Sequence, residues 1–353
     1  MYSYQQLFTF TKKVFKSIGC PEEEADLATE VLLSADLRGI DSHGVARLIG
    51  YVRLWENNRI NATPRIQTTH ETPSTAVIDG DSGLGLVVAP KAMQIAIQKA
   101  QVAGTGWVAV KNSNHFGIAG YHAMQALPHD MIGIAMTNAS PLVAPTNSLE
   151  RLLGTNPIAV AIPAKEQPAF VADFATTTAA NGKLEILQRK NQEAPLGWIQ
   201  DAQGNNSINP HELKAGGALV PLGGDTGSHK GYCLGAVIDI FSAVLSGANY
   251  GPWVPPFVSF LPLAANPVGD GIGHFFGAMR IDAFRAADDF KTHMDNWITT
   301  FRNSKAKSSE SPVLIPGDPE RLTTAKRLQD GIPLLEPVIK DLQTLAERFS
   351  LPF

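Results

Sequence analysis

A short polar turn between two apolar segments limits the folds open to this chain. Its sequence is Asn-Ser-Asn-His-Phe-Gly, at residues 112–117. Residues 106–110 before it alternate like a short buried strand, and residues 118–127 after it have the spacing of an apolar helix. A histidine, two amides and a hydroxyl are therefore expected at a strand-to-helix junction, where open α/β sheets bind their ligands. A well-hydrogen-bonded loop without a function is the alternative interpretation.

Strand-like and helix-like segments alternate through the middle of the chain and predict an α/β domain. The segments that resemble strands are residues 75–78, 107–110, 132–136, 158–162, 169–172 and 274–281. The segments that resemble helices are residues 86–103, 118–127, 178–189 and 223–246. Residues 192–222 and 247–273 are rich in Gly and Pro and are expected to form loops, the second a lid or interface loop.

Helical periodicity marks both ends of the chain. The expected helices cover residues 7–18, 21–39, 43–55, 283–300, 321–329 and 337–349. We therefore expect a helical module made of residues 1–73 together with the C-terminal helices of residues 284–353. It would pack on a central α/β domain of residues 74–283.

The third of these helices carries a polar stripe. Ser42 is expected to be its N-cap, and His43, Arg47 and Tyr51 follow at i, i+4 and i+8 on one face. An arginine can clamp a carboxylate with two hydrogen bonds, and a neighbouring histidine can exchange a proton near neutral pH. The stripe indicates an acid-binding, proton-handling site, and a solvated surface arginine is the alternative interpretation.

A glycine-rich segment at residues 223–231 opens a helix and ends in His229-Lys230-Gly231. Backbone N–H groups at a helix N-terminus, together with a lysine, indicate an anion site, although an ordinary helix-opening turn would look similar. The segment is not a P-loop, because Gly-Lys-Ser/Thr is absent. No G-x-G-x-x-G occurs either, since Gly271-Ile272-Gly273 is out of register with Gly277. A dinucleotide would therefore bind without the Rossmann fingerprint.

Charge and composition argue against several other classes of protein. The net charge is −4 and no Lys/Arg-rich run occurs, so neither nucleic acid nor an anionic membrane is expected as a partner. Cys20 and Cys233, the two cysteines, stand in unrelated contexts and fit a reducing cytoplasm rather than a disulfide framework. Zinc-binding spacing and the G-x-S-x-G elbow of serine hydrolases are both absent, so no metal site and no hydrolase is predicted.

Several segments in order resemble one enzyme family. They are DSHGVARL, NSNHFG, TNP, ADFAT, GK, PLGG and HKGY, at residues 41–48, 112–117, 155–157, 172–176, 182–183, 221–224 and 229–232. Over about residues 4–335 the chain resembles the malate/L-lactate dehydrogenase family. This family is non-Rossmann and also holds L-sulfolactate and ureidoglycolate dehydrogenases, diketogulonate reductase and cyclic imine reductases.

The resemblance implies an NAD- or NADP-dependent homodimer with active sites near the subunit interface. It assigns the cofactor to Ser140, Asp173, Phe174, Ala175, His229, Lys230, Gly317 and Asp318. It assigns the substrate to Ser42, His43, Arg47, Tyr51 and His115. The chain departs from the family pattern at Ser228 and Cys233, where glycine is usual, and in a longer, more Pro-rich loop at residues 248–273.

The sequence therefore predicts hydride transfer between a nicotinamide and C2 of a small 2-hydroxy or 2-oxo acid, such as malate or lactate. Arg47 is expected to hold the carboxylate, and His115 or His43 to exchange the proton, while Ser42 and Asn114 orient the oxygen. The alternatives are a ureidoglycolate or cyclic imine substrate, and a dinucleotide-binding protein without catalysis. The sequence does not determine which acid is the substrate or whether the cofactor is NAD or NADP.

Overall fold

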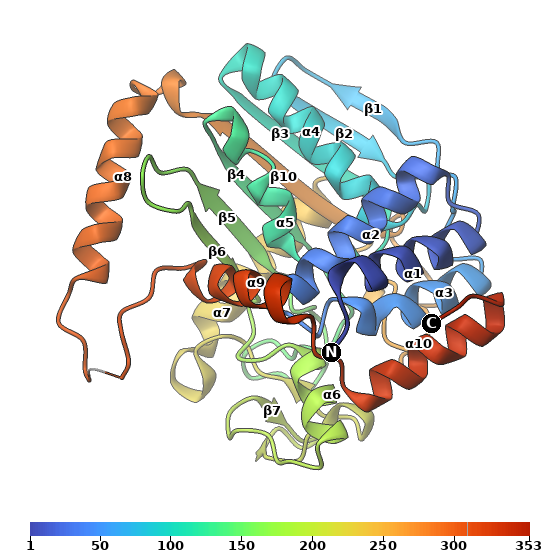
Figure 1. The fold of residues 1–353 in the computed structure, drawn as a ribbon. Coiled ribbons are helices and arrows are strands. Elements are labelled where there is room, and N and C mark those ends of the chain that lie inside the picture. The colour runs from blue at the N-terminus through green and yellow to red at the C-terminus, as the bar shows by residue number, and fades with distance from the viewer. Residues whose placement is uncertain (309) are drawn as a thin grey trace.

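The computed structural model describes residues 1–308 and 310–353, and the side chains of these residues except that of residue 225. Its centre is a seven-stranded sheet with the order β1-β2-β3-β10-β4-β5-β6 (Figure 1). The strands are β1 (Gln67–Glu71), β2 (Thr75–Asp79), β3 (Thr105–Ser113), β4 (Met131–Thr137), β5 (Ile158–Ile162), β6 (Phe170–Phe174) and β10 (Ile272–Arg280). β2 and β3 are parallel, and the other neighbours are antiparallel. The fold is therefore α/β, as predicted, and its sheet is not the parallel sheet of a Rossmann domain.

The last strand of the sheet in the sequence, β10, lies in the middle of the sheet between β3 and β4. Successive side chains of a strand point to opposite faces. Phe275 thus meets Phe241 on one face, with ring centroids 5.3 Å apart, while Phe276 is fully buried on the other. Gly277 lets the ring of Trp107 pack against β10, because a Cβ there would lie 2.4 Å from that ring.

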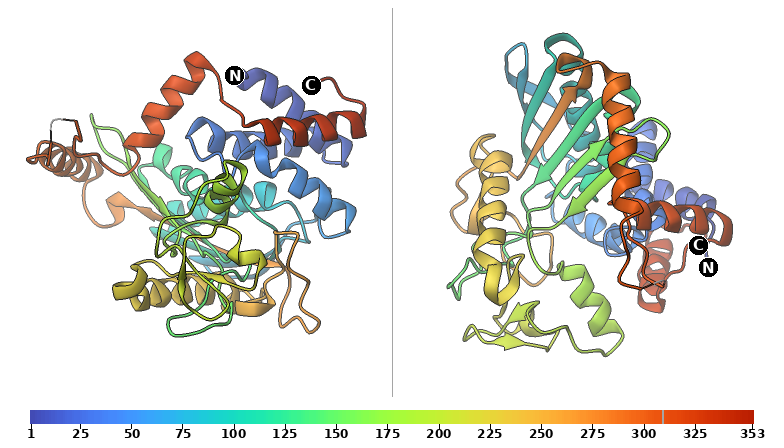
Figure 2. Two further views of the ribbon diagram at one scale, coloured as in Figure 1. Left: turned by 90° about the horizontal axis from the view of Figure 1, so that it is seen from below. Right: turned by 90° about the vertical axis from the view of Figure 1, so that its left-hand side faces the viewer.

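Helices cover both faces of the sheet (Figure 2). They are α4 (Gly85–Ala103) and α5 (Ala119–Met124) on one face, and α7 (Gly224–Asp239) with the π-helical segment Ile240–Val244 on the other. α4 and α5 lie close to the strands because glycines remove the side chains beneath them. A Cβ on Gly106 would lie 2.0 Å from the carbonyl oxygen of Ala96, and one on Gly133 would lie 2.0 Å from that of Ala123.

The helices of both chain ends come together beside the sheet (Figure 1). They are α1 (Tyr4–Ser17), α2 (Glu22–Leu37), α3 (Leu48–Glu56), α9 (Asp318–Asp330) and α10 (Glu336–Phe349). α10 contacts α1 and α3, α9 contacts α2, and Tyr2 stacks on Phe353 with ring centroids 5.5 Å apart. The predicted helical module of both termini is therefore confirmed, whereas the domain boundaries at residues 73 and 283 stay predictions.

One C-terminal helix, α8 (Ala287–Arg302), lies outside this module (Figure 1). It lies beside β6, which forms one edge of the sheet. The carboxylate of Asp295 accepts hydrogen bonds from the backbone N–H groups of residues 165–167, at 2.8 to 3.0 Å. Lys165 also forms an ion pair with Asp288 at 2.9 Å. These contacts fix α8 to the β5–β6 connection.

Two parts of the fold differ from the sequence-based prediction. β1 is absent from that prediction because its five residues are all exposed, so no alternation of apolar and polar residues marks it. Residues 192–222, predicted to be loops, contain a small antiparallel sheet. Its strands are β7 (Ile199–Gln200), β8 (Asn206–Ser207) and β9 (Ala218–Leu219), which are too short to show a period.

Candidate active site

The segment that precedes α3 is a turn. α3 begins at Leu48 and follows the 3₁₀ turn Val45–Arg47, so the predicted helix from residue 43 with Ser42 as its N-cap is wrong. The start of the helix is displaced, but His43 still lies one turn of chain before Arg47. The predicted polar stripe therefore ends in a turn, which changes how His43 is held.

Asp36, on α2, explains why the chain turns here. Its Oδ2 accepts a hydrogen bond of 2.8 Å from the N–H of Val45. A Cβ on Gly44 would lie 2.1 Å from the Asp36 carboxyl group, so only glycine fits. Burial raises the pKa of Asp36 to about 8, which keeps the carboxyl group protonated at neutral pH. Sequence reasoning missed Asp36 because nothing in its local pattern distinguishes it from other acidic residues of a helix.

The predicted substrate residues converge on one point. The hydroxyl of Tyr51 hydrogen-bonds Nδ1 of His115 at 2.6 Å, although the two residues come from α3 and from the turn after β3. The rings of His115 and His43 are stacked, with centroids 5.7 Å apart. Nε of Arg47 donates to the carbonyl oxygen of Ser42 at 2.6 Å. The structure thus brings all five predicted residues into contact.

The hydrogen bonds of His115 define its tautomer. The backbone N–H of Gly117 points at Nδ1 at 3.3 Å and can only donate, so Nδ1 is an acceptor. The hydroxyl of Tyr51 is then the second donor to the same nitrogen. Burial, followed by electrostatic interaction with the His43 ring and with the charge of Arg47, lowers the pKa of His115 well below its usual value. The ring is neutral and carries its proton on Nε2, where it can donate a hydrogen bond.

Ser42 orients the ring of His43. Its Nδ1 lies 2.8 Å from the hydroxyl oxygen of Ser42, and Nε2 makes no hydrogen bond within the described part of the chain. Burial first, and then the charge of Arg47, lowers the pKa of His43 to about 3. With Nδ1–H donating to Ser42, the neutral ring has a lone pair on Nε2 that can accept a proton.

Arg47 is fixed on two sides. Besides its bond to Ser42, one terminal nitrogen lies 3.0 Å from the carboxylate of Glu185 on α6 (Asn181–Arg189). Gly182 brings α6 this close, since a Cβ there would lie 2.8 Å from the same terminal nitrogen. The second terminal nitrogen is the one that can meet a substrate carboxylate. Sequence reasoning missed Glu185, whose pairing depends on how α6 packs against the turn that carries Ser42 and Arg47.

Phe257 is a further member of the site that the sequence did not indicate. It belongs to the Pro-rich loop, residues 247–271, and its ring lies 4.7 Å from that of His115 and 5.2 Å from that of Tyr51. The hydroxyl of Ser140 accepts a hydrogen bond from the N–H of Phe257 at 2.9 Å. In the structure, Ser140, which the sequence predicts to bind the cofactor, holds the loop over the histidines.

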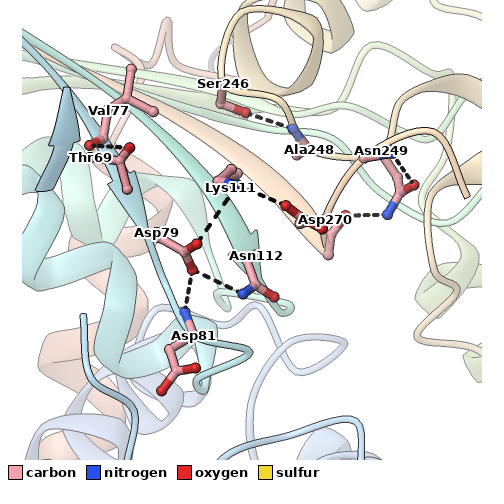
Figure 3. Close-up of polar contacts among 12 residues, drawn as sticks. Thr69, Val77, Asp79, Asp81, Lys111, Asn112, Ser246, Ala248, Asn249 and Asp270 are labelled. Atoms are coloured by element: carbon pink, nitrogen blue, oxygen red, sulfur yellow. Dashed lines mark hydrogen bonds and ion pairs between the residues drawn. The ribbon is translucent and has the colours of Figure 1, made fainter. Parts of the chain in front are cut away.

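The base of the Pro-rich loop is tied to the strand that leads into the site (Figure 3). Lys111 on β3 forms an ion pair with Asp270 at 2.7 Å and lies 3.7 Å from Asp79 at the end of β2. The N–H of Asn112 also donates to the carbonyl oxygen of Asp270 at 2.7 Å. The loop that carries Phe257 and the turn that carries His115 thus share one anchor.

Asn114 lies in the same turn but faces the backbone. Its amide nitrogen donates to the carbonyl oxygens of Arg59, Ser82 and Gly83, at 2.9 to 3.2 Å. The side chain is 5 % exposed. In the structure, Asn114 holds the turn in place, and its predicted contact with a substrate oxygen stays a prediction.

Another group of predicted cofactor residues lies at the end of β6. Asp173 accepts a hydrogen bond of 2.7 Å from the N–H of Gly120, and burial raises its pKa to about 6. Phe174 is exposed and Ala175 partly buried. Gly317 and Asp318 lie against the same strand, since the adjacent residue Pro316 accepts a hydrogen bond from Val171 at 3.0 Å. Asp318 itself is bound by Arg302 and Arg321, so its carboxylate supports the loop.

His229 and Lys230 lie in the first turns of α7. Both are exposed and make no hydrogen bond or ion pair within the described residues. The space above Gly224 and Gly227 is open, with no atom within 4 Å of a Cβ placed there. An open helix N-terminus with two unpaired basic side chains fits a pyrophosphate group. Asn156 links α7 to the end of β6, because its amide donates to the carbonyl oxygen of Gly235 at 3.0 Å and its carbonyl oxygen accepts from the hydroxyl of Thr176 at 3.2 Å.

An arginine beside two neutral histidines, next to a sheet without Rossmann topology, is an arrangement that can bind an acid and exchange a proton with it. A family model described as malate/L-lactate dehydrogenase matches residues 2–343. The chain belongs to this family and is a hydroxy acid dehydrogenase.

Individual relatives agree with this assignment. A malate dehydrogenase from Pyrococcus abyssi is 44% identical over 98% of this chain and 94% of the relative. An L-sulfolactate dehydrogenase from Methanocaldococcus jannaschii is 38% identical over 96% of this chain and 94% of the relative. The crystal structure of a malate dehydrogenase from Entamoeba histolytica superposes with a TM-score of 0.92 at 33% identity, covering 99% of this chain and 98% of the other.

Proposed function

We propose that this chain is an NAD- or NADP-dependent dehydrogenase of a malate-like 2-hydroxy acid. The observation that supports it most is the hydrogen-bonded pair of Tyr51 and His115, stacked on His43 next to Arg47. The site offers a cation for the carboxylate, a donor for the C2 oxygen and a base for its proton. The names of the similar proteins support malate or sulfolactate as the acid.

In the oxidation direction, the free terminal nitrogen of Arg47 binds the substrate carboxylate and fixes the position of C2. Nε2–H of His115 donates a hydrogen bond to the C2 oxygen as negative charge develops there. Nε2 of His43 accepts the hydroxyl proton, while the hydrogen bond to Ser42 keeps that ring oriented. A bound nicotinamide would supply the hydride acceptor for C2. Phe257 excludes water from one side of the histidines.

The cofactor is proposed to lie between the two outer groups of residues. Lys230 and His229 would bind its pyrophosphate at the N-terminus of α7. The end of β6, with Asp173, Phe174 and Ala175, and the loop with Gly317 and Asp318 would hold another part of the dinucleotide. Ser140 would link the cofactor to the loop that carries Phe257.

The other interpretations are not favoured. A ureidoglycolate dehydrogenase from Escherichia coli O157:H7 is 28% identical, below the malate and sulfolactate dehydrogenases. A cyclic imine reductase from Pseudomonas syringae, named for Δ1-piperideine-2-carboxylate, is 25% identical in the structural comparison. A binding protein without catalysis would have no need for the Nε2 atoms of His43 and His115, which make no hydrogen bond within the described residues.

A panel of acids tests the proposal. With malate or sulfolactate, the protein is expected to reduce NAD or NADP, with kcat/KM at least about tenfold above that for ureidoglycolate. Absorbance of the reduced nicotinamide follows the reaction. Cofactor binding without turnover of any 2-hydroxy acid would instead support the non-catalytic alternative.

We also propose a homodimer. α7 and the π-helical segment expose an apolar stripe at the spacing i, i+3, i+4 and i+7. Its members are Val237, Ile240, Phe241 and Val244, which are 41 to 51% exposed. Sedimentation is expected to give twice the mass of one chain, and Ile240→Glu to shift it to one chain. A wild-type protein that sediments as a monomer at assay concentration would contradict this proposal.

Other observations concern the location of the protein and the class of molecule that it binds. In residues 1–308 and 310–353, the structure has no helix long and apolar enough to cross a membrane. Cys20 and Cys233 are both free thiols, which supports our proposal of a reducing, cytoplasmic location. The net charge of −4 supports a small-molecule substrate rather than nucleic acid as the partner.

A further inference from the structure

A cavity of about 610 Å³ opens next to Arg47. α3, α6 and the Pro-rich loop form its walls, and Ser42, Arg47, Arg53 and Phe257 are among its lining residues. Since Ser42 and Phe257 also touch the two histidines, the cavity extends the site where the substrate carboxylate would bind.

The acidic residues of this cavity are neutralised. Glu185 pairs with Arg47, Asp341 with Arg189 and Asp41 with Arg327, and burial raises the pKa of Asp36 to about 8. Three lining cations, Arg53, Lys190 and Lys214, make no ion pair within the described part of the chain. The cavity therefore carries unpaired positive charge, which attracts anions.

Arg53 is linked to the histidines through Phe257. One of its terminal nitrogens donates to the carbonyl oxygen of Phe257, whose ring contacts His115. The guanidinium of Arg47 lies 6.0 Å from the centre of the same ring. The pKa of Arg53 is lowered, first by partial burial and then by repulsion from the charge of Arg47, and the carboxylate of Glu185 opposes this only in part. A neutral carbonyl does not offset that repulsion.

We propose that Arg53 binds the second acidic group, a carboxylate or sulfonate, of a dianionic 2-hydroxy acid whose first carboxylate binds Arg47. A dianion compensates both guanidinium groups, whereas a monoanion such as lactate leaves Arg53 unpaired in a partly buried site. Arg53 is thus a specificity residue that selects malate-like acids over lactate. The inference rests on the proposed dehydrogenase function.

Arg59 provides a matched control for the test. Like Arg53 it is partly buried and donates to the Pro-rich loop, at 2.9 Å to the carbonyl oxygen of Pro256. It does not belong to the cavity lining. Replacing either arginine with leucine removes one tie to the loop, but only Arg53→Leu removes a cation from the cavity.

The experiment compares kcat/KM for malate, sulfolactate and lactate. In Arg53→Leu, kcat/KM for the two dianions is expected to fall about 10- to 50-fold relative to lactate, mostly through KM. Arg59→Leu is expected to change kcat/KM for all three acids by one common factor. Arg53→Lys is expected to recover part of the preference for the two dianions over lactate. Loss of thermal stabilisation by malonate in cofactor-free Arg53→Leu, relative to Arg59→Leu, gives a readout independent of turnover.

The outcomes separate the two claims. A wild-type enzyme that oxidises 2-hydroxy acids, but whose preference for dianions survives Arg53→Leu, overturns the role of Arg53 and leaves the dehydrogenase function intact. An equal loss for all three acids in both leucine variants also overturns it, because Arg53 would then only anchor the loop. A wild-type protein that oxidises none of the acids with either cofactor overturns the proposed function and, with it, this inference.

Discussion

Replacing His43 with alanine is expected to lower kcat for oxidation of the 2-hydroxy acid by about 10²- to 10⁴-fold, the usual contribution of a positioned general base. Nε2 of His43 makes no hydrogen bond within the residues described, so it is available to the substrate hydroxyl. Burial and the charge of Arg47 lower the pKa of His43 to about 3, so the ring is neutral and able to accept a proton. Steady-state kcat at saturating acid and cofactor is the measurement.

The two reaction directions should respond to pH with opposite sign. Oxidation needs the neutral ring, so His43 should not limit it above about pH 5, whereas reduction needs the protonated ring and should slow as pH rises. His43→Ala should remove this difference between the directions. If oxidation by His43→Ala kept the wild-type single-turnover rate, another group would have to accept the proton.

His115→Ala serves as the contrasting variant. Because Nδ1 of His115 accepts from Gly117, its contribution is a hydrogen bond from Nε2 rather than a free lone pair. Loss of one such donor is expected to lower kcat by about 10²- to 10³-fold while leaving the opposite pH dependence in place. His115→Gln, which keeps an N–H donor, should recover part of the rate. If the pH dependence vanished in His115→Ala and survived in His43→Ala, the two roles would be reversed.

The elements of the fold could be predicted where local periodicity is strong. The helices of both termini, the strand before the 112–117 turn and the helix after it follow from the spacing of apolar residues. The central position of β10 could not be predicted, because its partners β3 and β4 lie far away in the sequence and no local pattern encodes that pairing. The polar edge strand β1 lacks a period altogether.

The residues of the site also fall into those that local spacing predicts and those that it does not. Arg47 and Tyr51 could be placed together from helical spacing, and His115 from its position after a strand. The spacing predicts one helix from residue 43, whereas contact with Asp36, a residue of another helix, turns the chain at Gly44. Glu185 and Phe257 could not be predicted for the same reason, since each reaches the site only because α6 or the Pro-rich loop packs against it.

Arg47→Leu is expected to lower kcat/KM for every 2-hydroxy acid by about 10²- to 10³-fold, because the substrate carboxylate loses its charged partner in a partly buried site. The folding stability of the Arg47→Leu variant should be little affected. Glu185, left without Arg47, still receives a hydrogen bond of 2.8 Å from Asn181, and its side chain is 31% exposed to water. Thermal unfolding and initial rates of the same preparation measure the two effects.

Glu185→Gln tests whether the ion pair with Glu185 positions Arg47 or competes with the substrate for it. Glu185 holds one terminal nitrogen of Arg47, and Ser42 holds Nε, so together they aim the second terminal nitrogen into the cavity. If that positioning matters, Glu185→Gln should raise KM about two- to fivefold with little change in kcat, since the guanidinium gains freedom that substrate binding must remove. If Glu185 instead competes with the substrate for Arg47, its neutralisation should lower KM. We expect the rise, because the substrate can use the second terminal nitrogen while Glu185 keeps the first.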